Sequence, residues 1–173
     1  MAAPLVVSFV LRDLLTLIDY PFASRLGAEG SGLGEASLAA LGLTQPIVFL
    51  MIACWVGASN GLTARLSAAM GAGEGERVDQ LKRAAMRIQF VLIAVFLAVA
   101  VGIWFFADRL GLDPLVEKQF RIYATVFVAS RAVTSFGSIL PDSLVKAHHD
   151  TKSTMWAGLI SGISNFVLNV LFV

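Results

Sequence analysis

The chain has 173 residues, of which 57% are hydrophobic and only 14% are charged, and its mean hydropathy is +0.79. Soluble globular domains carry about 25% charged residues, so this composition excludes an ordinary water-soluble domain and indicates a membrane protein. A formal net charge of +1, with no tract of Lys or Arg, excludes nucleic acid as a partner.

Five hydrophobic segments follow one another along the chain, and about 20 apolar residues are enough to cross a bilayer. The clearest segment, 88–107, carries no charge and has Trp104 near one end, where an interfacial anchor is expected. The other segments are interrupted by polar or charged residues or by proline. The expected spans are 5–23, 44–70, 88–107, 122–140 and 155–173, the last of them unfinished where the chain ends.

Short loops join these segments, and backbone groups in lipid must satisfy their hydrogen bonds within the structure. Because the apolar runs are too few for a barrel, the sequence predicts an all-α polytopic membrane protein, a bundle of helices. Seven Lys and Arg residues lie in or beside the second and fourth loops, against four on the opposite side. The positive-inside rule then places these two loops and the N-terminus in the cytoplasm.

A few polar residues lie inside the expected spans, where a charged side chain costs about 2.5–3.5 kcal/mol on insertion scales. Asp19 could exchange a proton or hold a cation, or it could be solvated at the outer end of its helix. Asn165 and Asn169 stand four apart on one helix face, where they could complete such a site or only join helices. The weaker candidates for residues that line a cavity are Gln45, Asn60 and Arg131.

Motifs for catalysis or metal binding do not stand out. The run 71–75, Gly-Ala-Gly-Glu-Gly, lacks the spacing and the lysine of a phosphate-binding loop. The run 148–150, His-His-Asp, points adjacent side chains in different directions, and no further His or Cys supplies the remaining metal ligands. We therefore expect no enzyme activity, no cofactor and no metal centre.

Three stretches, in chain order, resemble the multidrug and toxic compound extrusion (MATE) family. LIDYPFASRLG, followed by LAALGL, resembles the family's Asp-containing first helix. GASNGLTARLSAAMGAGEGERVDQLK, at 57–82, resembles its Gly-containing second helix, Gly-Ala-Gly turn and acidic-basic helix start. HDTKSTMWAGLISGISNFVLNVLFV resembles its Gly-Asp-Thr-Lys loop and Asn-bearing fifth helix, although His149 replaces the glycine and Asn169 stands where one branch has an acid.

The resemblance implies an antiporter, coupled to protons or sodium ions, that exports amphipathic or cationic organic compounds by alternating access. It implies that Asp19, Asn165 and Asn169 form the ion-coupling site. The family fold has twelve helices in two lobes, so this chain would be an incomplete N-terminal lobe that works with the remaining half of the transporter. The expected location is the lipid bilayer of the cell membrane, in bacteria the inner membrane.

Two alternatives stay open at this point. A flippase for lipid-linked saccharides shares the helical architecture, but more basic residues would be expected to face its cavity, where Arg131 is the strong candidate. The other alternative is a truncated membrane scaffold that does not transport.

Overall fold

The computed structural model describes residues 21, 23–25, 31–148 and 151–172, and every element within these ranges is helical. Three described helical stretches are long and apolar enough to cross a membrane, namely Leu33–Gly71, Gly75–Leu110 and Pro114–Ala147. The protein is therefore an all-α membrane bundle, which confirms the predicted fold class. The elements, in order, are α2 (Leu33–Gly71), α3 (Gly75–Phe106), the 3₁₀ helix η1 (Ala107–Leu110), α4 (Pro114–Gly137), α5 (Ile139–Ala147) and α6 (Thr151–Phe172).

The helices extend beyond the apolar runs seen in the sequence. The expected spans 44–70 and 88–107 lie on α2 and on α3 with η1, and the expected span 122–140 runs from α4 into α5. With 39 residues, α2 is about 58 Å long at 1.5 Å per residue, well over the roughly 30 Å hydrocarbon core. Most of 5–23 lies outside the described residues, and 155–172 lies on α6.

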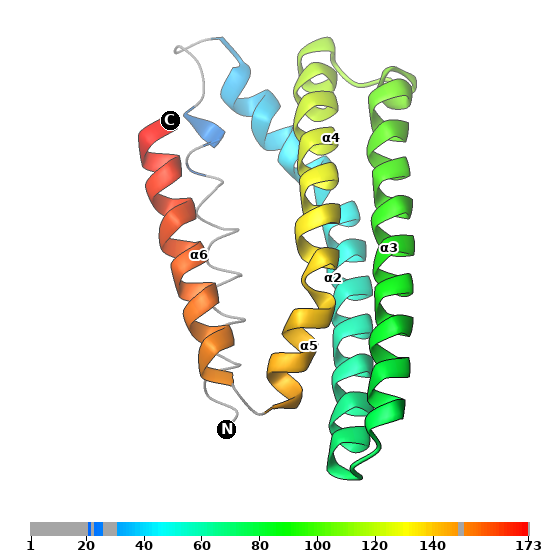
Figure 1. Ribbon diagram of the computed structural model, residues 1–173. Coiled ribbons are helices and arrows are strands. Elements are labelled where there is room, and N and C mark those ends of the chain that lie inside the picture. Colours follow the sequence, from blue (N-terminus) through cyan, green and yellow to red (C-terminus); the bar gives the residue numbers. More distant parts are fainter. Residues whose placement is uncertain (1–20, 22, 26–30, 149–150, 173) are drawn as a thin grey trace.

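One stripe of α4 forms the centre of the bundle, because α4 packs against both α2 and α3 (Figure 1). Residues four apart share one face of a helix, and large and small side chains alternate along this stripe. Phe96 of α3 stacks on Phe136, with ring centroids 5.1 Å apart. The buried residues of α4 are Phe120, Ala124, Val128, Ala132 and Phe136.

The Gly-Ala-Gly turn between α2 and α3 is a Schellman motif. Gly73 adopts a left-handed φ of 71°, which L side chains rarely tolerate. Its N–H bonds to the oxygen of Met70 at 3.1 Å, and the Glu74 N–H bonds to the oxygen of Ala69 at 3.0 Å. This pair of bonds satisfies carbonyl groups that the end of a helix leaves open.

The short helix α5 connects the central helices to α6. It packs against α2, α3 and the end of α4, and among the described elements it is the one that α6 contacts. Figure 1 shows α5 as an angled continuation of α4, below it in this view. The side chains of α5 lie against the C-terminal half of α2, where Asp142 bonds to Ser59 and Ala147 packs in one cluster with Leu66 and Ala69.

Candidate functional site

The fourth membrane segment is broken between Gly137, the last residue of α4, and Ile139, the first residue of α5. Pro141 has no N–H with which to bond the carbonyl oxygen four residues earlier, which is that of Gly137. Gln89 on α3 takes over this role, because its Nε2 donates to the Gly137 oxygen at 3.2 Å. Irregular backbone at membrane depth is tolerated where protein groups satisfy it, and here a neighbouring helix does so.

A second side chain reaches the break from α2. The indole Nε1 of Trp55 donates to the hydroxyl oxygen of Ser138 at 3.4 Å, near the long limit for a hydrogen bond. The Ser138 hydroxyl in turn donates to the carbonyl oxygen of Ser135 at 2.7 Å. The break is thus fastened to α2 and α3 at once.

One turn further along, α5 carries an ion pair that is nearly buried. Lys146 Nζ lies 2.7 Å from Asp142 Oδ2, and the two side chains are only 14% and 12% exposed. Ser59 of α2, itself 0% exposed, donates its hydroxyl to the same Oδ2 atom at 2.8 Å. Asp142 therefore accepts one hydrogen bond from its own helix and one from α2.

Further contacts tie this pair to α2. The Ser143 hydroxyl donates to the carbonyl oxygen of Ser59 at 3.2 Å. The ammonium of Lys146 lies 5.2 Å from the centre of the Trp55 ring, within the roughly 6 Å range of a cation–π interaction. We call Trp55, Ser59, Asp142, Ser143 and Lys146 the α2–α5 cluster.

The α2–α5 cluster offsets the cost of removing two charges from water. Desolvation of an ion pair is repaid only where geometry is good and further hydrogen bonds satisfy the remaining groups. Asp142 lies in the first turn of α5 and Lys146 in its last turn, where each charge is favoured by the helix dipole. The cluster is thus a specific, charged contact between α5 and α2.

The α2–α5 cluster was not expected from the sequence. The fourth expected span ends at 140 and Lys146 is one of the seven basic residues assigned to the second and fourth loops, whereas the apolar helical stretch continues to Ala147. A usable signal was present, because Asp and Lys four residues apart share a helix face. Their partner Ser59 lies 83 residues from Asp142, and nothing in a single sequence indicates that contact.

The structure describes some of the candidate site residues named from the sequence, and these lie on different parts of the bundle. Asp19 lies outside the described residues, and Asn165 and Asn169 lie on α6 with side chains that are also outside the described part. Gln45 is half-buried and Asn60 is exposed, and 15 residues of helix, about 22 Å, separate them on α2. Arg131 of α4 lies over the ring of Phe127, with its guanidinium carbon 5.3 Å from the ring centre.

The comparison with family models decides the identity. The MatE model matches residues 4–173, nearly the whole chain. The chain belongs to the MatE family. Neither a curated protein nor a solved structure matches it.

MatE proteins are membrane transporters rather than enzymes, so the function lies in moving a compound across the bilayer. The family match confirms the resemblance drawn from the three sequence stretches. The described ion pairs on the stretches long enough to cross a membrane include Asp142–Lys146 of the α2–α5 cluster, whose side chains are less exposed than those of Glu117–Arg121.

Proposed function

We propose that this MatE transporter is an antiporter, driven by protons or sodium ions, that exports amphipathic or cationic organic compounds. It works by alternating access, with its N-terminus in the cytoplasm of a cell whose inner membrane it crosses. The partial lobe at 1–173 acts together with a second half of the transporter, as the family resemblance implies. Family membership is the general support for this proposal.

The observation that carries the proposal is the broken fourth segment with its buried ion pair. Alternating access needs an element with two discrete arrangements that substrate and ion bias differently. The joint between α4 and α5 is a natural point of movement, because no main-chain hydrogen bond can link Pro141 to Gly137. The α2–α5 cluster supplies contacts specific enough to define one arrangement.

We assign the coupling ion to Asp19, with Asn165 and Asn169 completing its site. A carboxylate can carry a proton or hold Na⁺, and amide oxygens are suitable further ligands. The ion binds more tightly in the outward-facing state and so lowers the affinity for the exported compound. The difference in ion affinity between the two states provides the free energy of coupling.

Efflux of a fluorescent organic cation from cells tests this assignment. Asp19→Asn in the complete transporter should abolish efflux and leave the amount of protein in the membrane unchanged. Asp108→Asn is the matched control, because Asp108 is exposed on η1 at the end of a helix, and it should transport normally. Unchanged efflux by Asp19→Asn would defeat the role we give this carboxylate.

A further inference from the structure

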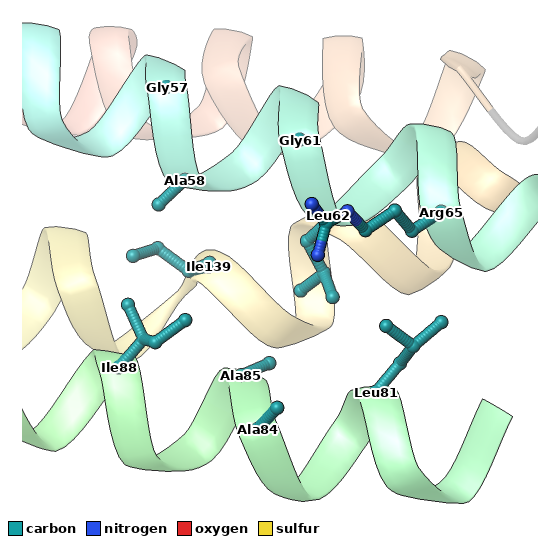
Figure 2. Close-up of a pocket in the computed structure, with 10 residues that line it drawn as sticks. All are labelled: Gly57, Ala58, Gly61, Leu62, Arg65, Leu81, Ala84, Ala85, Ile88 and Ile139. Carbon is teal, nitrogen blue, oxygen red and sulfur yellow. The ribbon is translucent and has the colours of Figure 1, made fainter. Parts of the chain in front are cut away.

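A groove lies between α2 and α3, in the halves of the two helices nearest their shared turn, and Figure 2 shows the residues that line it. Its volume is about 250 Å³. A Cβ atom added at Gly57 or at Gly61 would meet no other atom within 4 Å, so the wall formed by α2 leaves open space. Ala84 and Ile88 of α3 form the opposite wall.

Basic residues lie toward the turn on both helices, but the last of them lies at a different height on each helix. On α3, Arg87 is followed at once by Ile88 and the uncharged run to Ala107. On α2, Arg65 lies about 9 Å before the end of the helix at Gly71, at 1.5 Å per residue. Arg87 lies about 18 Å from the start of α3 at Gly75, so the inner end of the groove, at Gly57 and Ile88, borders the uncharged run. Arg65 lies about 12 Å nearer the turn than Gly57, on the side of the lipid headgroups.

The polar end of the groove carries the positive charge of Arg65, which no described residue neutralises. Arg77 and Lys82 pair with Glu74 and Asp79. Within the described residues, however, Arg65 makes no hydrogen bond or ion pair. Figure 2 shows its side chain lying back along α2, so that the guanidinium nitrogens reach the level of Leu62 at the mouth of the groove.

We propose that the α2–α3 groove binds one anionic phospholipid. Arg65 holds its phosphate, and part of an acyl chain lies over Gly57 and Gly61. Basic pockets between membrane helices on the cytoplasmic side recognise anionic headgroups, and a guanidinium can bond a phosphate through two N–H groups. On the orientation proposed above, the lipid comes from the cytoplasmic leaflet. Its binding does not depend on the transported compound, so it can be measured without a transport assay.

Lipid binding to the complete transporter purified in detergent tests the proposal, with native mass spectrometry as the readout. The wild type should retain phosphatidylglycerol in preference to phosphatidylcholine at equal concentration. Arg65→Gln should weaken phosphatidylglycerol binding about fivefold, as expected for one basic residue near an anionic lipid. Inorganic phosphate should not compete, because the acyl chain contributes to binding.

Two matched controls separate this site from general surface charge and from misfolding. Arg83→Gln removes an exposed arginine of α3 that does not line the groove, and it should change binding less than twofold. Gly61→Leu should fill the groove and displace the lipid, whereas Gly42→Leu, at an equally open and exposed position of α2, should not.

If Arg65→Gln and Arg83→Gln lost phosphatidylglycerol binding equally, the proposal would be overturned, because the lipid would then be attracted by the general surface charge. Competition by inorganic phosphate would show an anion site without lipid, and binding unchanged in Arg65→Gln would also overturn it. Cross-linking of Gly61→Cys to another protein segment, in place of lipid, would show that protein covers the groove. If Gly61→Leu does not fold, the result for Arg65→Gln decides the matter, because Arg65 is exposed and its replacement should not impair folding.

Discussion

Gln89 of α3 donates a hydrogen bond to the carbonyl oxygen of Gly137 at the end of α4, over a distance of 3.2 Å. That oxygen has no helical partner because Pro141 lacks an N–H. A residue 48 positions earlier in the chain therefore supplies the donor that the proline removes. The contact links α3 to the joint on which the proposed movement of α5 depends.

Replacement of Gln89 by Leu should lower the free energy of unfolding by about 1 kcal/mol, because it leaves the Gly137 oxygen without a donor. Pro141→Ala restores an N–H four residues after Gly137, so Gln89→Leu should cost less in that background. Chemical unfolding in detergent, followed by circular dichroism, measures all four proteins of the cycle. An equal cost of Gln89→Leu in both backgrounds would show that the amide does not replace the missing helical bond.

Loss of one member of the buried ion pair should be more harmful than loss of both. Asp142→Leu or Lys146→Met alone leaves a charge without its partner and should lower the free energy of unfolding by about 3–5 kcal/mol. The double variant should be markedly more stable than the sum of the single effects suggests. The same unfolding assay measures this cycle, and purely additive effects would mean that the two charges do not interact.

Ser59 and Asn60 are adjacent on α2 but differ in their surroundings. Ser59→Ala removes a hydrogen bond to the Asp142 carboxylate and should lower the free energy of unfolding by about 1.5–3 kcal/mol. Asn60→Ala changes an exposed side chain and should change the free energy of unfolding by less than about 0.5 kcal/mol. Thermal unfolding of the two variants measures this difference. Equal melting temperatures would contradict the hydrogen bond between Ser59 and Asp142.

The glycines of the turn after α2 should respond differently to alanine. Gly73→Ala forces a Cβ into the left-handed region and should cost about 1–2 kcal/mol. Gly71 is the last helical residue of α2 and has open space at its Cβ position, so Gly71→Ala should be neutral or stabilise by up to about 1 kcal/mol. Similar melting temperatures for the two variants would contradict the observed turn geometry.

The sequence predicted the features that depend on local patterns. Apolar runs of sufficient length indicated α2, α3 and α4, whereas the Gly-Ala-Gly turn that Gly73 closes was expected from the family resemblance. Low charge indicated the membrane. These features require no knowledge of which helices touch.

The polar contacts at the centre of the candidate site could not be predicted in the same way. Gln89 is one polar residue in the uncharged run 88–107, and its role depends on where Pro141 falls relative to α3. Ser59 meets Asp142 only because α5 packs against α2. Such contacts depend on helix packing, which a single sequence does not contain. The roles of Asp19, Asn165 and Asn169 stay predictions.

Counter-transport by the complete protein in liposomes tests the proposed antiport most directly. Liposomes are loaded with a fluorescent organic cation, and a proton gradient or a sodium gradient is then imposed across their membrane, inward and outward in turn. We expect one of the two ions, when it flows in the opposite direction, to accelerate movement of the organic cation, and reversal of that gradient to reverse the movement. Movement that neither gradient alters would contradict cation-coupled antiport.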